Sequence, residues 1–136
     1  MGLKNGRCSG KRQIGAYGRN RTEHPEFKGV EMEKYVVVLV TTSSREEAED
    51  IAFKLISSGL TPCVNIIPKC HSIYQWKDEL HRDEEALMFI KARSGYFEAL
   101  VDAVTEYHSY DVPEVIALEV DSISPKYLAF LDGFFK

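Results

Sequence analysis

The chain has 136 residues, of which 44% are hydrophobic and 28% charged, and this composition fits one globular domain. No apolar run approaches the roughly 18 to 20 residues of a membrane-spanning helix, and no apolar signal segment opens the sequence, so we expect a cytoplasmic protein without membrane contact. Residues 1–31 carry a net charge of +4 and residues 32–136 a net charge of −8. An acidic body argues against nucleic acid as a partner and favours cations.

The first 31 residues are rich in glycine and basic side chains and have almost no periodic apolar pattern. We expect a disordered or poorly ordered extension, residues 1–31, followed by one folded domain over residues 32–136. Two interpretations of the basic extension are open. It is either a solvated tail, with Met32 as an alternative start, or a segment that touches nucleic acid or a membrane surface.

The folded part opens with a strand and a helix. The β-branched, apolar run Tyr35–Thr41 predicts a strand that is buried on both faces. Ser44 and Glu47 have the spacing of a capping box, which predicts the start of a helix. Apolar residues then recur three and four positions apart until Gly59, where we expect the helix to end.

The segment Thr61–Trp76 is the most informative part of the sequence. As one strand it would reach roughly 50 Å, more than twice the usual length, at about 3.3 Å per residue. Pro68 lacks an N–H and predicts a bulge. After a tight turn at Lys77 and Asp78, the chain returns as a strand over Glu79–Arg93. Because such a hairpin overhangs a small domain, we expect it to pair with another copy in an obligate oligomer.

The C-terminal part predicts a helix, a strand and a short last helix. Ser94 is placed to cap the first of these, and Pro113 predicts a loop over residues 107–113. A strand follows at 114–120, and Ser124 with Pro125 predicts the start of the last helix. The order β-α-β-β-α-β plus a terminal helix predicts an α+β, ferredoxin-like fold with both main helices on one face of an antiparallel sheet. A partner subunit would cover the other face.

No nucleophile, phosphate-binding or zinc motif is present, so we do not expect an enzyme. His108 and Glu114 are the candidate metal ligands, because imidazole and carboxylate groups suit a divalent ion such as copper or zinc. The alternatives are a histidine that caps a helix end, where the helix dipole favours it, and an ordinary charge at the start of a strand.

Five further residues are candidates for a ligand cleft. Tyr74, Trp76 and Tyr110 are suited to an aromatic wall, although packing between subunits is the alternative for the two strand residues. Lys91 lies in an apolar strand, where it either binds an anion or faces outward. Cys63 is either a soft ligand or thiolate, or a buried structural cysteine.

The segments VVVLVT, PCVNIIP, SIYQW, FIKAR and YHSYDVPEVIAL together resemble the CutA family of divalent-cation tolerance proteins, from about Tyr35 to Phe135. The resemblance implies a ferredoxin-like domain that forms a tight trimer through intersubunit sheets, an architecture similar to that of the trimeric PII signalling proteins. It also implies copper tolerance and binding of divalent ions in some members. His108 and Glu114 fall at the histidine and glutamate of the family motif.

The sequence departs from the family at two positions. Val40 stands where some members carry a copper-binding cysteine, and Tyr107 stands where some carry a second histidine. The loss of soft ligands favours harder or borderline ions, or none. We therefore expect a homotrimer that binds a divalent metal or a small ligand in an intersubunit cleft. The alternative is a PII-like scaffold that acts through protein partners, although the turn at Lys77 and Asp78 is short for that role.

Overall fold

The computed structural model describes residues 34–135. Its sheet has the strand order β2-β3-β1-β4, and each neighbouring pair is antiparallel, which confirms the expected α+β arrangement. The expectation of a disordered extension lies outside the described residues. The elements are β1 (Tyr35–Thr42), α1 (Arg45–Ser57), β2 (Cys63–Trp76), β3 (Glu79–Arg93), a 3₁₀ helix (Ser94–Tyr96), α2 (Phe97–Tyr107), β4 (Val115–Glu119) and α3 (Pro125–Phe134).

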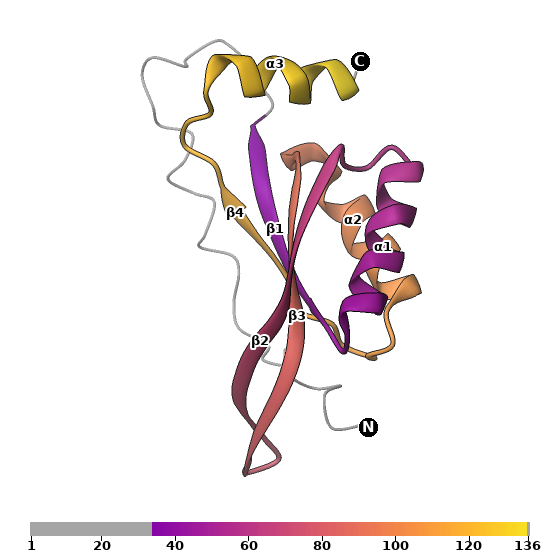
Figure 1. Ribbon diagram of the computed structural model, residues 1–136, viewed down its shortest axis with the longest axis vertical. Helices are drawn as coiled ribbons and strands as arrows, with labels where there is room; N and C mark the ends of the chain where they lie inside the picture. Colours follow the sequence, from indigo (N-terminus) through magenta and orange to yellow (C-terminus); the bar gives the residue numbers. More distant parts are fainter. Residues whose placement is uncertain (1–33, 136) are drawn as a thin grey trace.

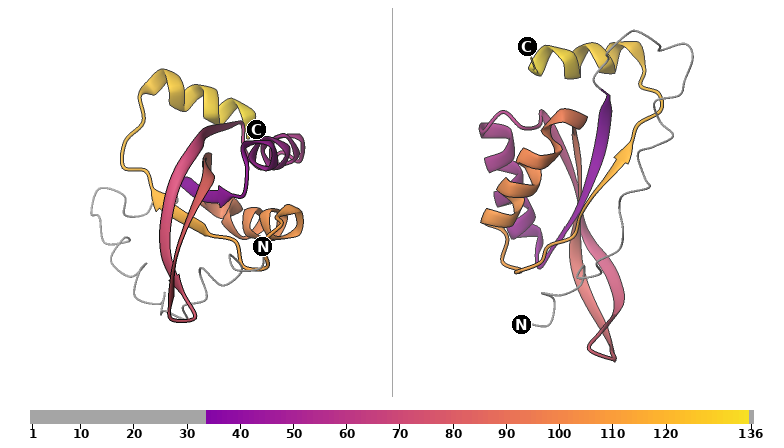
Figure 2. Two further views of the ribbon diagram at one scale, coloured as in Figure 1. Left: turned by 60° about the horizontal axis from the view of Figure 1, so that its bottom comes forward. Right: turned by 180° about the vertical axis from the view of Figure 1, so that it is seen from behind.

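Helices α1 and α2 lie side by side on one face of the sheet, while α3 crosses its end (Figures 1 and 2). Alternate residues of β1 and β3 point toward α1 and α2, as the two-residue period of a strand requires. Fully buried side chains of the two layers form the core: Val38, Val40, Met88 and Ile90 from the sheet, and Ile51, Leu55, Leu100 and Val104 from the helices. None of the described helices is long and apolar enough to cross a membrane.

The opposite face of the sheet is largely uncovered, and we call it the open face. Within residues 34–135, only α3 reaches this face, at the end beside Tyr35, whose hydroxyl donates to Asp132. Val37 and Leu39 are half-buried there, and Leu118 and Ile116 opposite them are each 46% exposed. The prediction that the first strand is buried on both faces therefore holds for one face of a single chain.

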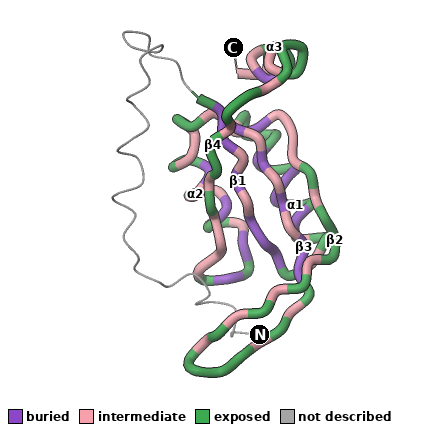
Figure 3. The backbone as a smooth tube through the Cα atoms, turned by 90° about the vertical axis from the view of Figure 1, so that its left-hand side faces the viewer, coloured by how far each residue is buried: buried purple, intermediate pink, exposed green. Residues whose placement is uncertain are grey.

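The hairpin of β2 and β3 extends well past the rest of the domain (Figures 1 and 3). We call the part from Cys70 to Glu85 the overhang. Its turn residues, Lys77 and Asp78, have φ of 54° and 64°, the left-handed values that a two-residue type I′ hairpin turn needs. A shift in register between Ile67 and Cys70 confirms the bulge predicted at Pro68.

Helix α1 begins and ends as predicted. The Ser44 side chain accepts a hydrogen bond from the Glu47 N–H at 3.1 Å. At the other end Gly59 has φ of 77°, and the N–H of Leu60 reaches the carbonyl of Leu55, which together form a Schellman motif. Both ends thus satisfy backbone groups that a helix leaves without partners.

The start of α2 differs from the prediction. Ser94 begins the 3₁₀ helix instead of capping α2, and Tyr96 occupies the N-cap position of α2 with no capping hydrogen bond from its side chain. The expected last helix does begin at Ser124 and Pro125, but the Ser124 side chain makes no capping bond either. A serine before an apolar stripe marks the region of a helix start, yet local turn geometry decides whether its hydroxyl is used.

The Glu47 carboxylate links the start of α1 to the loop after α2. It accepts hydrogen bonds from the N–H and hydroxyl of Ser43, at 3.0 and 2.7 Å, and from the N–H of Ser109 at 2.7 Å. Burial by itself raises the pKa of this carboxyl, but the hydrogen bonds from Ser43 and Ser109 outweigh burial and hold the pKa below its ordinary value. Glu47 is therefore held as a carboxylate that joins two segments far apart in the sequence.

Replacing Leu55 with alanine tests the core. Leu55 is fully buried, so Leu55→Ala is expected to lower the free energy of unfolding by about 2–5 kcal/mol. Phe53 lies on the same helix and is 72% exposed, so Phe53→Ala is the matched control, with an expected change within about 0.5 kcal/mol. Guanidinium unfolding at fixed protein concentration measures both. Equal losses for the two variants would contradict the packing described above.

Replacing Glu47 with glutamine tests the link between α1 and the loop after α2. Because the folded-state pKa of Glu47 is lowered, its stabilisation is present above the unfolded-state pKa and is lost as the pH falls through the folded-state pKa. Glu47→Gln is therefore expected to cost about 1–2 kcal/mol of unfolding free energy near neutral pH, and less as the pH falls below about 4. The control is Glu46→Gln, at an exposed neighbouring carboxylate. A pH-independent difference would argue against this role.

Candidate functional site

The sheet places the predicted site residues at three separate levels along its strands. Cys63 and Lys91 face each other at the end next to α3. His108 contacts the other end of β1, about 13 Å further along β3 at roughly 3.3 Å per residue. Tyr74 lies about another 20 Å away on the overhang, and Trp76 lies beyond it. A cleft lined by all of them therefore requires more than one chain.

His108 is buried, and both of its ring nitrogens are engaged. Its side chain is 0% exposed, Nε2 donates to the Thr41 carbonyl at 2.8 Å, and Nδ1 accepts the Tyr110 N–H at 3.0 Å. This pattern is that of a neutral imidazole with its proton on Nε2. A Glu47 oxygen lies 3.6 Å from Nδ1. A metal ion can reach either nitrogen only after one of the two hydrogen bonds breaks.

His108 also occupies the position expected from the alternative interpretation, in which this histidine caps the end of a helix. It is the C-cap residue of α2, and its N–H donates to the Val104 carbonyl at 2.9 Å. Its ring then holds the following loop against the end of β1 through Tyr110 and Thr41. A structural role for His108 is therefore evident in a single chain, whereas its role as a metal ligand stays a prediction.

Tyr110 extends this network to a buried carboxylate. Its ring lies 4.6 Å from the His108 ring, and its hydroxyl donates to Glu85 Oε2 at 2.7 Å. Glu85 is 1% exposed and was not predicted from the sequence, where it stands beside Asp83 and Glu84 as one of several strand charges. Its signal was position, because it is the last residue of the overhang, next to the part of β3 that pairs with β1. A carboxylate buried this far requires hydrogen-bond donors.

Glu114 lies directly before β4 and is half-buried. In the described part of the chain, no three His, Cys, Asp or Glu side chains gather in a group that could hold a metal ion. A metal ion bound to His108 and Glu114 would therefore need a third donor from beyond residues 34–135 of this chain, either elsewhere in the chain or in another subunit. The donor set of residues 34–135 alone does not fit a resident metal.

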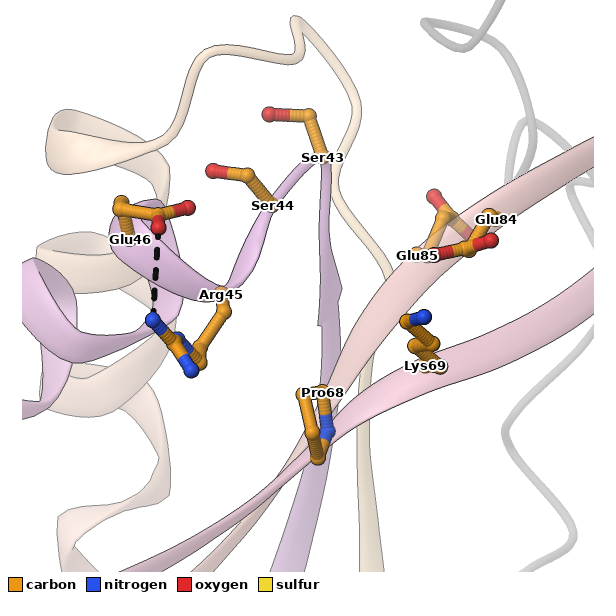
Figure 4. Close-up of a pocket in the computed structure, with 8 residues that line it drawn as sticks. All are labelled: Ser43, Ser44, Arg45, Glu46, Pro68, Lys69, Glu84 and Glu85. Carbon is orange, nitrogen blue, oxygen red and sulfur yellow. Dashed lines mark ion pairs between the residues drawn. The ribbon is translucent and has the colours of Figure 1, made fainter.

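A pocket of about 300 Å³ opens between the start of α1 and the bulged hairpin (Figure 4). Arg45 and Glu46, whose side chains lie 3.7 Å apart, form one wall, and Lys69 with two glutamates lies opposite. The pocket thus combines both signs of charge, which suits a small ligand that also carries charged groups. Its lining residues are Ser43, Ser44, Arg45, Glu46, Pro68, Lys69, Glu84 and Glu85.

The pocket adjoins the network around His108. Glu85 lines the pocket and accepts the Tyr110 hydroxyl, and Ser43 lines it and donates to Glu47. A ligand in the pocket would therefore lie one side chain away from Tyr110. The sequence pointed to this region through Pro68 and Ser44, which both line the pocket.

The aromatic residues of the overhang pack against their own hairpin. The Tyr74 ring stacks on His81 at 5.4 Å, and its hydroxyl donates to Asp83. The Trp76 ring lies under the Lys77 ammonium, 5.4 Å from it. Tyr110 is buried at another level, so one chain does not assemble the three-residue aromatic wall.

Lys91 and Cys63 form a direct contact. The Lys91 Nζ lies 3.6 Å from the Cys63 sulfur, and both side chains are half-buried on the side of the sheet away from α1 and α2. Lys91 therefore does not enter the main core. Its position beside a cysteine is the result of strand register, which residue types alone do not reveal.

Comparison with known proteins places the chain among relatives of one kind. Protein CutA, chloroplastic, of Arabidopsis thaliana is 42% identical over 96 residues, which cover 71% of this chain and 53% of the plant protein. The divalent-cation tolerance protein CutA of Thermus thermophilus is 40% identical over 95 residues, covering 70% and 92%. This chain spans about half the length of the plant relatives that it matches. Since both plant relatives are named chloroplastic, a cytoplasmic location stays a prediction.

The fold and the sequence family agree. The crystal structure of CutA1 from Oryza sativa superposes with a TM-score of 0.73 at 38% identity, covering 76% of this chain and 95% of that one. The sequence model of the CutA1 divalent ion tolerance protein matches residues 36–133, from the second residue of β1 to the penultimate residue of α3. The chain therefore belongs to the CutA1 family of divalent ion tolerance proteins.

Proposed function

We propose that the protein is a binding protein without catalytic activity, which assembles as a homotrimer and holds a divalent cation or a small charged ligand where subunits meet. One observation carries the proposal. The open face of the sheet is apolar and continues into a hairpin that extends past its own domain. Residues 34–135 of a single chain leave both features largely uncovered.

The composition of the open face supports assembly. A contiguous apolar surface is uncommon on a soluble monomer and usually marks an interaction site. Two sheets that pack face to face bury such residues between them. The family resemblance implies that the number of copies is three. The residues available for this contact are Val37, Leu39, Ile67, Leu87, Phe89, Ile116 and Leu118.

The edges of the sheet support the same proposal. Within residues 34–135, strands β2 and β4 each pair on one side only, and β2 runs for 14 residues. Edge strands of this length present backbone groups that another chain can pair with. Exposed Ile73 and Leu80 on the overhang add apolar surface beyond the domain. Pairing of the overhang with a neighbouring subunit would cover both the backbone groups at the strand edge and these apolar side chains.

The pocket beside the His108 network is the best-supported binding position. It offers carboxylates from Glu46, Glu84 and Glu85 to a cation, and Arg45 and Lys69 to an anionic group. Because these donors are oxygen and nitrogen atoms, they suit harder or borderline ions better than soft ones. The described residues of one chain lack a complete metal-binding group, so we expect a second subunit to complete a metal site.

Replacing Leu118 with glutamate tests the assembly. A charge buried between two apolar sheets is strongly unfavourable, so Leu118→Glu is expected to reduce the solution mass from about three times the 15.5 kDa chain toward that of one chain. Phe53→Glu places the same charge on the solvent side of α1 and should leave the mass unchanged. Size-exclusion chromatography with light scattering measures both. An unchanged mass for Leu118→Glu would show that the open face is not the interface.

Native mass spectrometry after exposure to copper or zinc tests the binding site. The full-length wild-type assembly is expected to retain metal after buffer exchange, whereas Leu118→Glu should retain little, because the described residues of a single chain lack a complete donor set. A His108→Ala, Glu114→Ala double variant should also retain less metal, and His71→Ala, at an exposed histidine on the overhang, should not change retention. Equal retention by wild type and Leu118→Glu, or none by either, would overturn the intersubunit metal site.

A further inference from the structure

Helix α2 carries three carboxylates on the side that faces away from the sheet. Glu98, Asp102 and Glu106 follow one another at intervals of four residues, so they lie along one face of the helix, and all three are exposed. We call them the acidic row. The fully buried Leu100 and Val104 point the other way, into the core. Because α1 and α2 cover the sheet face opposite the open face, assembly through the open face does not cover the acidic row (Figures 1 and 2).

The acidic row is not neutralised within residues 34–135. None of its carboxylates forms an ion pair with another residue of that range, and α2 has no basic residue in its last turn. Like charges four positions apart on a helix repel each other. Glu106 also lies near the C-terminal end of α2, where the helix dipole disfavours a negative charge. A positively charged partner would therefore stabilise this face of α2.

Helix α1 provides a contrast within the same layer. Its Arg45 lies 3.7 Å from Glu49, and its Lys54 lies 3.0 Å from Asp50, with four positions between the members of each pair. These carboxylates are thus balanced by basic residues of their own helix. On α2 the balancing charge would have to come from another segment.

The first 21 residues of the chain carry the complementary charge, and we call them the basic segment. They contain six Lys or Arg residues and no Asp or Glu, so their net charge is +6. The family model matches residues 36–133, so the basic segment lies outside the part of the chain that resembles the family. Its positive residues are Lys4, Arg7, Lys11, Arg12, Arg19 and Arg21.

The described part of the chain begins beside the start of α2. The Lys34 carbonyl accepts a hydrogen bond from the Ser94 N–H at 2.7 Å, and Ser94 opens the 3₁₀ helix that leads directly into α2. The spacer between residue 21 and Lys34 can span roughly 43 Å at about 3.3 Å per residue. Helix α2 has 11 residues and is only about 16 Å long at about 1.5 Å per residue. The basic segment can therefore reach the whole acidic row of its own chain.

We propose that the basic segment binds along α2 of its own chain, through ion pairs between its Lys and Arg side chains and the acidic row. The position where the described chain begins, the length of the spacer and the opposite charges of the two partners support this contact. Exposed ion pairs are individually weak and are screened by salt, so several must act together and the contact weakens as the ionic strength rises. The contact involves neither the pocket beside α1 nor the open face.

Digestion of the full-length protein with a low concentration of trypsin tests the proposal. Trypsin cleaves after Lys and Arg, and it reaches the basic segment only when the segment is released from α2. At low salt, cleavage within residues 1–21 is expected to be about tenfold slower in the wild-type protein than in a variant that lacks the acidic row. About 0.5 M salt should abolish this difference. Mass spectrometry of the released peptides measures each rate.

The control variant loses three exposed carboxylates of the overhang and should be cleaved as slowly as the wild type. Both variants change the net charge by the same amount and alter no buried side chain, so both are expected to fold. The row variant is Glu98→Gln, Asp102→Asn and Glu106→Gln, and the control variant is Asp78→Asn, Glu79→Gln and Glu84→Gln.

Three results would overturn the proposal. Equal cleavage rates in the wild type and the row variant would show that the acidic row does not hold the basic segment. Equal acceleration in the control variant would assign the protection to the overall negative charge of the domain. Protection that appears only after RNA or anionic lipid vesicles are added would assign the basic segment a different partner.

The same digestion separates this inference from the proposed assembly. Leu118→Glu should protect the basic segment as well as the wild type does, because the contact lies within one chain. Loss of protection in Leu118→Glu would place the contact between subunits and overturn the proposal. An unchanged solution mass for Leu118→Glu would contradict the proposed interface and leave the digestion test of the acidic row as it stands.

Discussion

Strand β3 is the element on which the other parts depend, because it is hydrogen-bonded along both edges and runs through both the compact body and the overhang. From Leu87 to Lys91 it pairs with β1 on one side and β2 on the other, and its helix-facing residues there are fully buried. From Glu79 to Glu85 it has only β2 as a partner. The boundary between the compact body and the overhang therefore falls at Glu85. The bulge, the pocket and the buried carboxylate all lie at this boundary, where the sheet loses one of its partners.

The polar groups at the boundary explain how a loop can be ordered beside the end of a sheet. His108, Tyr110, Glu85 and Glu47 each make hydrogen bonds to residues distant in the sequence. Burying a carboxylate or an imidazole without partners would cost several kcal/mol, so the loop after α2 is stable only in the conformation that satisfies them. The same hydrogen bonds keep the His108 ring from binding a metal unaided. A metal ion bound to His108 would have to replace one of these hydrogen bonds.

Local patterns in the sequence predicted where the helices and strands lie. They could not predict the contacts between distant segments, which the pairing register of the strands determines. The period of the apolar residues, the Ser44 cap, Gly59 and Pro68 each reflect a constraint within a few residues, and each appears in the structure as expected. The predicted cap at Ser94 does not appear, because a 3₁₀ helix precedes α2. The burial of Glu85, the bond from Ser109 to Glu47 and the contact of Lys91 with Cys63 depend on segments 25 or more positions apart. Residue type alone gives no sign of such pairs. The predicted cleft residues were likewise identified by type, and the sheet distributes them over three levels.

The bulge at Pro68 changes which side chains share a face. Before it, Cys63, Asn65 and Ile67 share the open face with Lys91, Phe89 and Leu87, and after it the even-numbered residues Cys70, Ser72, Tyr74 and Trp76 take over that side. The extra residue therefore shifts the alternation of side chains along β2 by one position, so that both aromatic rings lie on the same side as the open face. A one-residue deletion at this point would reverse the two sides of β2 along the whole overhang, whereas a two-residue change would preserve them. Insertions of an even number of residues in this segment should therefore be tolerated better than insertions of an odd number, because only an even change keeps each side chain of the overhang on its own face.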